Sequence, residues 1–248
     1  MLVSHRKQFI FLRTSKCAST SVELFLEPWC FAEGEYRASS ERSLTITPQG
    51  VVAPRHDVGA GREPEAGYSS HMPARSLKPL LGSELWERYT KITIVRNPFD
   101  RMISMFYWQR GGLQRSSPLM RWRRRVAALR GRGMVIDRLR EDGDVAQFRE
   151  WVRRGGCIDD THIYLLDGQV CADVCLRYER LAEDLEALCA RLDIPFDPDR
   201  LGHHKSEHRD RRFDVRDFYD AETEQRVRQT FAAELERFGY DLPAAARS

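Results

Sequence analysis

The sequence lacks several features on which common functional classes depend. No glycine occurs between Arg13 and Glu33, so the glycine-rich phosphate loop of nucleotide kinases, G-x-x-x-x-G-K-[ST], is absent from this segment. The six cysteines form no Cys-x-x-Cys pair and suggest no disulfide framework, so we expect reduced thiols. The apolar run Phe9–Leu12 is far too short for a signal peptide, and no stretch approaches membrane-spanning length. We therefore expect a cytoplasmic protein without a transmembrane segment.

Charge is nearly balanced over the whole chain. Lys and Arg number 40 against 37 Asp and Glu, and the net charge of +3 argues against a protein that binds nucleic acid through a basic surface. Residues 121–132 are a local exception, with six arginines and no acidic residue. This segment, which we expect to be helical, could be a solvated helix face, could bind an anionic acceptor such as an acidic glycan, or could lie near an anionic membrane surface.

Short apolar strands alternate with amphipathic helices along the chain. Strands are predicted at residues 8–12, 44–47, 51–53, 91–95 and 174–178. Helices are predicted at residues 21–26, 74–88, 97–109, 119–130, 145–153, 181–192 and 221–238. The alternation predicts an α/β fold, a single P-loop-like domain over residues 1–248 with a mainly parallel central sheet flanked by helices.

The first predicted strand runs directly into a loop of cationic, small and hydroxyl-bearing residues. The loop contains, in order, Lys16, Cys17, Ala18, Ser19, Thr20 and Ser21. Backbone N–H groups at a helix start favour an anion, the hydroxyl groups add donors, and small side chains let a phosphate approach the backbone. The segment therefore favours an anion site, although a polar strand–helix turn with a helix cap would use the same residue types.

The strand at residues 91–95 leads into a second loop of this kind. Asn97 is a good helix cap, and Pro98 suits the first helical position. Arg96 offers a fork of donors to a phosphate, and Ser104, seven residues after Asn97, would face the same side of the helix about two turns later. The strand ends in Arg96 and not in an acidic residue suited to magnesium, which disfavours a nucleotide kinase. Two anion loops suggest a ligand with phosphate at both ends; the alternative is a capped helix with surface charges.

These two segments resemble the sulfotransferases that use 3′-phosphoadenosine 5′-phosphosulfate (PAPS). Residues 16–21 resemble their 5′-phosphosulfate loop, and residues 95–104, Val-Arg-Asn-Pro-Phe-Asp-Arg-Met-Ile-Ser, resemble their 3′-phosphate motif. The similarity is closest to the branch of carbohydrate sulfotransferases that includes the heparan 2-O type, and residues 68–71, 177–181, 218–220 and 238–240 also look like that branch. One departure is Ser15, because the family usually has proline before the lysine.

The resemblance implies which residues hold the sulfuryl donor. Lys16, Ser19, Thr20 and Ser21, in one loop with Cys17 and Ala18, would hold the 5′-phosphosulfate of PAPS. Arg96 and Ser104 would hold the 3′-phosphate. A loop with Lys205 and Ser206 would close over the nucleotide phosphates. The product would be PAP, the 3′,5′-bisphosphate that remains after transfer.

Two residues are candidates for the chemistry. His71 is our candidate for the general base, because imidazole titrates near neutral pH. The resemblance points the same way, since the corresponding histidine in the heparan 2-O-type enzymes looks like the base. His56 is the second choice. Lys16 is the candidate that would stabilise the bridging oxygen as the S–O bond breaks. The sulfuryl group carries less charge than a phosphoryl group, so fixed donors could suffice without a metal.

The histidines near the C-terminus invite a different interpretation. His204 and His208 are four residues apart, and His203 is adjacent. No cluster of acidic residues or cysteines completes a metal site with them, so we predict no metal. On the helix predicted at residues 97–109, Phe106, Tyr107 and Trp108 could stack on an adenine, but we expect at least two of these aromatic residues to pack in the helix core.

We therefore predict a PAPS-dependent sulfotransferase that acts on a hydroxyl of a carbohydrate or of a glycosylated or lipid metabolite, by in-line transfer. A phenol or tyrosine acceptor is one alternative. A non-catalytic nucleotide-binding or scaffold protein with the same fold is another, and an ordinary P-loop kinase is the third. Acceptor specificity should lie in residues 33–70 and 109–145, neither of which has a decodable pattern.

Overall fold

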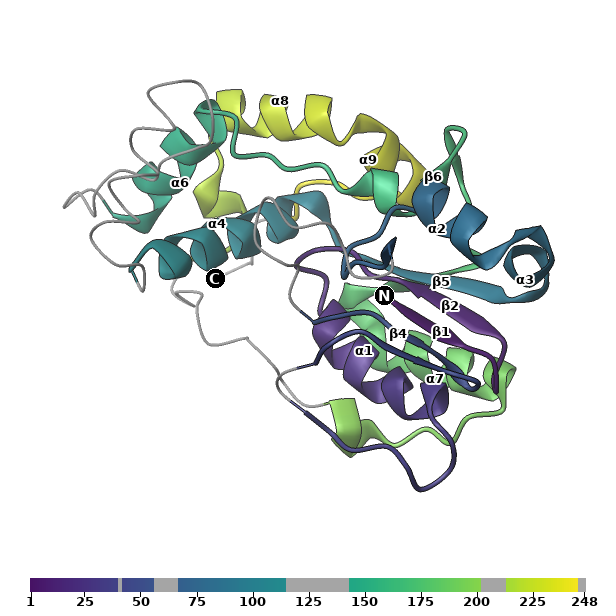
Figure 1. The fold of residues 1–248 in the computed structure, drawn as a ribbon. Coiled ribbons are helices and arrows are strands. Elements are labelled where there is room, and N and C mark those ends of the chain that lie inside the picture. Colours follow the sequence, from purple (N-terminus) through teal and green to yellow (C-terminus); the bar gives the residue numbers. More distant parts are fainter. Residues whose placement is uncertain (40–41, 56–66, 115–142, 202–212, 245–248) are drawn as a thin grey trace. The chain divides into compact units, whose positions relative to one another are not determined.

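The computed structural model describes residues 1–39, 42–55, 67–114, 143–201 and 213–244 (Figure 1). These residues form two compact units. The first unit contains the described residues of 1–96 and 160–201, and the second contains those of 97–159 and 213–244. The expectation of a single domain over residues 1–248 stays a prediction.

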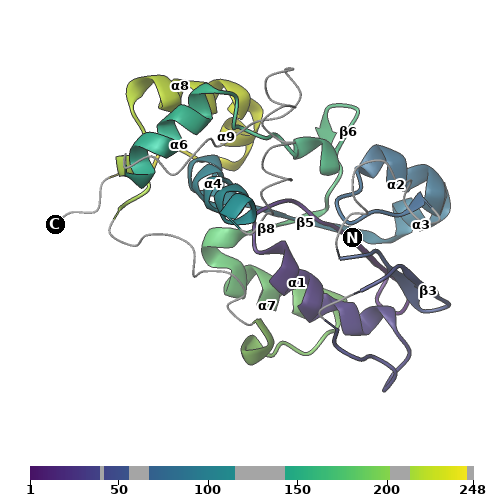
Figure 2. The same cartoon turned by 60° about the vertical axis from the view of Figure 1, so that its left-hand side comes forward.

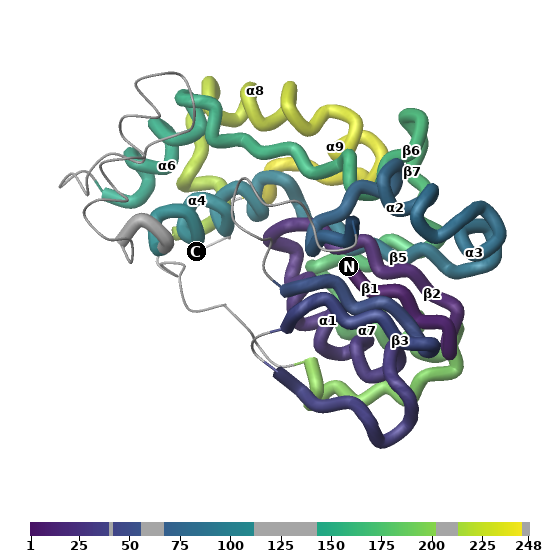
Figure 3. The backbone as a smooth tube through the Cα atoms, viewed as in Figure 1, coloured from purple at the N-terminus to yellow at the C-terminus, as the bar shows by residue number. Residues whose placement is uncertain are grey.

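The first unit is built on a six-stranded sheet in the order β3–β4–β1–β2–β5–β8. The strands are β1 (Leu2–Ser4), β2 (Phe9–Leu12), β3 (Thr45–Thr47), β4 (Gly50–Val52), β5 (Thr90–Val95) and β8 (Val174–Arg177). The strands β2, β5 and β8 run parallel to one another, and β1, β4 and β3 extend the sheet with antiparallel pairs. A small hairpin of β6 (Leu165–Leu166) and β7 (Gln169–Val170) lies beside α2 (Ala74–Leu81), as Figure 3 shows.

Helices cover both faces of this sheet. In Figures 1 and 2, α1 (Ser19–Leu26) and α7 (Leu181–Leu192) lie on one face, and α2 and α3 (Ser83–Arg88) lie on the other. Every residue of β2 is buried, as expected for a strand that is covered on both sides and therefore lacks polar alternation. The predicted α/β fold with a central sheet flanked by helices is confirmed. Short 3₁₀ helices complete the unit: η1 (Glu27–Cys30), η3 (Thr161–Ile163), η4 (Tyr178–Arg180) and η5 (Pro198–Leu201).

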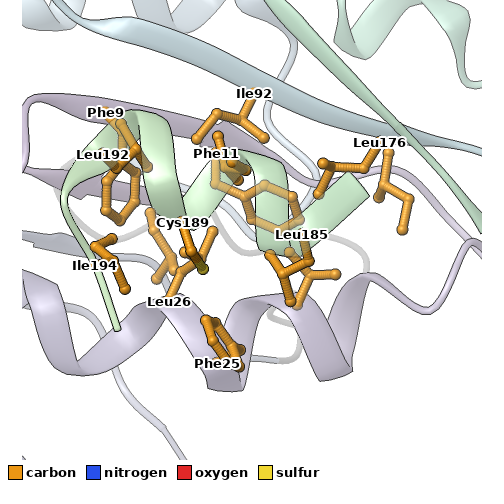
Figure 4. Packing of buried hydrophobic residues seen from close by; sticks show 14 of the residues in the cluster. Phe9, Phe11, Phe25, Leu26, Ile92, Leu176, Leu185, Cys189, Leu192 and Ile194 are labelled. Atoms are coloured by element: carbon orange, nitrogen blue, oxygen red, sulfur yellow. The ribbon is translucent and has the colours of Figure 1, made fainter. Parts of the chain in front are cut away.

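The main core of the first unit lies between the sheet and the pair α1 and α7. Figure 4 shows Phe9 and Phe11 from β2 packed in one cluster with Phe25 from α1 and Leu185 from α7. All four side chains are fully buried. This packing fixes where β2 ends and α1 begins, and therefore fixes both ends of the loop between them.

The second unit is helical and rich in aromatic residues. Its helices are α4 (Pro98–Gln114), α6 (Asp144–Arg153), η7 (Arg216–Phe218), α8 (Ala221–Thr230) and α9 (Ala232–Phe238). Phe106 and Tyr107 are buried in its core, whereas Trp108 is 52% exposed, which confirms that at least two of these three aromatic residues pack inside. Arg101 and Glu234 form a buried ion pair with a shortest N–O distance of 2.7 Å.

Several elements differ from the sequence-based expectations. The strand β1 was not predicted, because three residues are too few to show a period. The helix predicted at residues 74–88 is two helices, since Gly82 at φ 79° and ψ 154° adopts a conformation that essentially only glycine reaches. The helix predicted at residues 221–238 is broken at Phe231, whose ring is buried beneath the Arg101 guanidinium at 5.0 Å.

Candidate active site

The candidate site lies at one edge of the sheet of the first unit. Because β2, β5 and β8 are parallel neighbours, the loops that leave their carboxyl ends come off the same edge. These loops begin at Arg13, Arg96 and Tyr178. In open α/β sheets ligands bind at this edge. Both anion loops that the sequence predicts, after β2 and after β5, begin there.

The loop between β2 and α1 has the backbone shape of an anion site. Lys16 and Ala18 adopt left-handed conformations with φ of 61° and 60°, a region that residues other than glycine rarely visit. Turns of this kind point successive N–H groups into a concavity that favours an anion. The N-cap of α1 is Ala18, so no side chain caps the first turn, and the backbone N–H groups of that turn are the donors that α1 presents at its start.

Side chains divide the loop into a buried and an accessible part. Cys17 is fully buried in the core cluster, so only its backbone could reach a ligand. Ser19 and Ser21 are also buried, and Ser19 Oγ donates to the carbonyl oxygen of Thr14 over 2.6 Å, which closes the loop on itself. Lys16 and Thr20 are half-buried, so these two side chains are the better placed to meet a ligand.

Arg13 connects this loop to a distant segment. Its Nη1 donates to the carbonyl oxygen of Arg55 at 3.0 Å and to Ser70 Oγ, and its Nη2 donates to Thr20 Oγ1 at 3.2 Å. A hydroxyl that accepts from a guanidinium can still donate its own hydrogen, so Arg13 orients Thr20 as a donor. Sequence reasoning gave Arg13 no role. Its position directly after a buried strand was the one available signal.

Arg13 lies against a buried network of charges. Glu23 on α1 forms ion pairs with Arg13 at 3.7 Å and with Arg42 at 2.8 Å, while Glu27, one turn further, pairs with Arg42 and Arg55. Burial alone would raise the pKa of Glu23, but the N-terminal ammonium, Arg13 and Arg42 outweigh it and lower the pKa to about 2. Burial raises the pKa of Glu27. Glu23 therefore fixes the Arg13 guanidinium through an ion pair, and the same guanidinium donates to Thr20 in the loop.

His71 is tied to the first residue after β2. Its Nδ1 lies 3.0 Å from the carbonyl oxygen of Arg13. A carbonyl oxygen can only accept, so Nδ1 carries the hydrogen and the lone pair of the neutral ring is on Nε2. The imidazole is half-buried. The hydrogen bond to Arg13 therefore holds this ring in one tautomer at the start of the loop that contains Lys16.

Arg96 links the second loop to the first. Its Nη1 donates to the carbonyl oxygen of Lys16 over 2.8 Å, and its guanidinium lies over the Tyr178 ring at 3.9 Å from the ring centroid. The side chain is 8% exposed. The structure thus joins Arg96 to the backbone of Lys16, and it joins His71 to Arg13 at the start of the same loop. Tyr178 was not predicted, since stacking across 82 positions of sequence leaves no local signal.

Comparison with known families decides the identity. Residues 1–241 match a family model described as "Sulfotransferase family". The chain belongs to the sulfotransferase family. No curated protein and no solved structure matches the chain. The family match spans both compact units, and it supports a sulfotransferase enzyme that transfers a sulfuryl group to an acceptor substrate.

Other predicted residues of this sulfotransferase belong to the second unit or fall outside the described residues. Ser104 is half-buried on α4, in the second unit. The remaining positions lie outside the described residues: Lys205, Ser206, His56, His203, His204, His208 and the arginine segment 121–132. Among the residues that the structure describes, no group of three His, Cys, Asp or Glu side chains could hold a metal ion. In the same part of the chain, no helix is long and apolar enough to cross a membrane.

Proposed function

We propose that this sulfotransferase uses PAPS as its donor and transfers the sulfuryl group to an acceptor hydroxyl, with His71 as general base and Lys16 as the electrostatic catalyst. The observation that carries the proposal is the hydrogen bond between His71 Nδ1 and the Arg13 carbonyl oxygen, at 3.0 Å. It holds the His71 ring in a defined tautomer against Arg13, which lies three positions before Lys16 in the loop with the shape of an anion site.

The donor end follows from the loop after β2. The 5′-phosphosulfate would lie against the N–H groups of residues 16–21 and the first turn of α1, with Lys16 and Thr20 supplying side-chain donors. Arg13 supports this role, because its Nη2 donates to Thr20 Oγ1 at 3.2 Å and so orients the Thr20 hydroxyl as a donor. The buried Cys17, Ser19 and Ser21 would contribute backbone donors and loop shape rather than exposed side chains.

The other end of the nucleotide would be recognised by Arg96. A guanidinium has five N–H donors in a plane, so one bond to Lys16 is compatible with further bonds to a 3′-phosphate. Stacking on Tyr178 keeps that plane in one orientation. We propose that Ser104 adds a hydroxyl donor from α4 and that Lys205 and Ser206 close over the phosphates.

The reaction would be an in-line displacement at sulfur. The acceptor oxygen forms a new S–O bond while its proton passes to Nε2 of His71, the ring nitrogen that the Arg13 hydrogen bond leaves with the lone pair. The bond between sulfur and the bridging oxygen breaks, and its electron pair leaves with PAP. Lys16 would stabilise the charge that develops on that oxygen. This sequence balances protons and electrons without a metal or a covalent enzyme intermediate.

The acceptor is proposed from resemblance alone. The similarity to the heparan 2-O type favours a hydroxyl of a carbohydrate or of a glycosylated or lipid metabolite, in the cytoplasm. The arginines of residues 121–132 would suit an anionic glycan. A phenol or tyrosine acceptor, and a non-catalytic nucleotide-binding protein, remain the alternatives.

Calorimetry with PAP and with Mg-ATP tests the donor assignment. Tight binding of PAP without metal, and weak binding of Mg-ATP, is the expected result. Preference for Mg-ATP would reject the proposal in favour of a kinase. A screen of sugar, phenol and tyrosine-peptide acceptors with radiolabelled PAPS then separates the acceptor classes, and tight PAP binding with no transfer to any of them would favour the non-catalytic alternative.

A further inference from the structure

Ser15 makes a contact that proline could not make. Ser15 lies directly before Lys16, the lysine of the donor loop. Here the backbone N–H of Ser15 donates to Oδ2 of Asp160, and the N–O distance is 2.6 Å. A proline nitrogen carries no hydrogen and cannot form this bond. The carboxylate that accepts it lies 145 residues further along the chain and is 5% exposed.

The bond acts at the point where the loop needs a constraint. Lys16, the next residue, adopts the left-handed conformation that non-glycine residues avoid. Proline would restrict the chain before Lys16 by fixing its own φ, whereas serine leaves this dihedral open to rotation. A hydrogen bond from the Ser15 N–H to an ionised acceptor is short and directional, so it restricts the same peptide by another means.

Asp160 is itself held in place. Its carbonyl oxygen accepts the N–H of Ile163 at 3.0 Å, which begins the 3₁₀ helix η3. Ile163 and Tyr164 of the same segment are 1% exposed. The carboxylate is thus presented by a packed segment, and the loop is fixed from both sides of Lys16, by Asp160 on Ser15 and by Arg96 on the Lys16 carbonyl oxygen.

We propose that Asp160 is a positioning residue that, through its hydrogen bond with the Ser15 N–H, holds the donor loop in its anion-binding shape. This inference rests on the proposed function, because the shape matters for PAPS. Asp160 acts through the Ser15 backbone, so its role is to position the loop. Ser15 and Asp160 therefore act as a pair: a proline at position 15 could not donate to the carboxylate, and without the carboxylate the Ser15 N–H loses this acceptor.

A four-variant comparison tests this pair. Asp160→Ala should weaken PAP binding about tenfold in calorimetry, and Ser15→Pro should weaken it similarly because the ring meets the carboxylate. Ser15→Ala keeps the N–H and is the matched control, with affinity expected within about twofold of wild type. The double variant Ser15→Pro with Asp160→Ala should recover affinity to within about threefold of wild type, since proline then restrains the loop alone.

Amide hydrogen exchange provides a readout that needs no ligand. Exchange at residues 15–17 should accelerate about tenfold in Asp160→Ala and stay unchanged in Ser15→Ala, while the thermal midpoints of both remain close to wild type. Wild-type affinity in Asp160→Ala, or additive losses in the double variant, would overturn the inference. If wild type itself fails to bind PAP, the proposed function is wrong, and the exchange comparison alone still decides whether Asp160 restrains the loop.

Discussion

Arg96 Nη1 lies 2.8 Å from the carbonyl oxygen of Lys16, and this hydrogen bond joins the loop that follows β5 to the loop that follows β2. The Tyr178 ring, 3.9 Å from the same guanidinium, adds the element that follows β8. Three neighbouring parallel strands thus contribute to one cationic centre. A change at Arg96 should therefore affect the Lys16 loop as well as any anion that Arg96 binds itself.

Arg96→Lys tests this coupling. Lysine keeps the charge but has neither the planar fork nor the stacking surface, so it cannot hold the Lys16 carbonyl oxygen, the Tyr178 ring and a phosphate together. We expect the Kd for PAP to rise at least about tenfold, with a thermal midpoint near that of wild type. Arg88→Lys, at a half-exposed surface ion pair, is the matched control. Equal PAP affinity in the two variants would show that Arg96 does not serve the donor.

Arg13→Lys tests the link between donor loop and base. One ammonium cannot reach the Arg55 carbonyl oxygen, Ser70 and Thr20 as the guanidinium does. We expect weaker PAP binding and a lower kcat, because Thr20 loses its partner and the residue whose carbonyl oxygen holds His71 becomes less well fixed. Steady-state kinetics beside Arg154→Lys, an exposed arginine directly after α6, measures both effects. A change in stability with unaltered kinetics would limit Arg13 to a structural role.

Glu23→Gln tests the charged network by pH. The pKa of Glu23 in the folded protein is about 2, against 4.5 for an ordinary glutamate, so its contribution to stability is present above about pH 4.5 and is lost as the pH falls towards 2. Glu27, with a pKa raised by burial, acts in the opposite direction in both proteins. At pH 7 we expect the variant to lose about 3 kcal/mol of unfolding free energy, because Arg13 and Arg42 lose a buried partner.

The difference between wild type and Glu23→Gln should therefore shrink as the pH falls from 4.5 to 3. Urea unfolding at several pH values measures it. Glu84→Gln, which breaks an exposed ion pair on α3, should cost less than about 1 kcal/mol. A pH-independent difference for Glu23→Gln would contradict the assignment of its low pKa.

Local sequence patterns predicted the elements that carry the site and missed the contacts that assemble it. The strand at Phe9–Leu12, the loop with Lys16 and the helix start at Pro98 follow from apolar runs, helix caps and proline, which are properties of a few adjacent residues. The splits at Gly82 and Phe231 depend on one backbone conformation and on one buried ring, which a hydrophobic period does not register.

Contacts between residues far apart in the sequence could not be predicted for a different reason. Asp160 contacts Ser15 across 145 positions, and nothing in the residues around Asp160 distinguishes it from Asp159 beside it. Arg13 and Tyr178 likewise act through partners on other strands. The fold of the sheet brings such residues together, and a single sequence does not encode that proximity in any local pattern. Roles assigned to Lys205, Ser206 and Ser104 stay predictions.

The central claim is that His71 accepts the proton while the loops at β2 and β5 hold PAPS, and His71→Asn tests it most directly. Asparagine can still donate from Nδ2 to the Arg13 carbonyl oxygen, but it offers no basic nitrogen in place of Nε2. Transfer of radiolabel from PAPS to an acceptor found in the screen, measured beside PAP affinity, should fall by about 100- to 10,000-fold while the Kd for PAP stays within a factor of about two. Transfer near the wild-type rate in this variant would contradict the account.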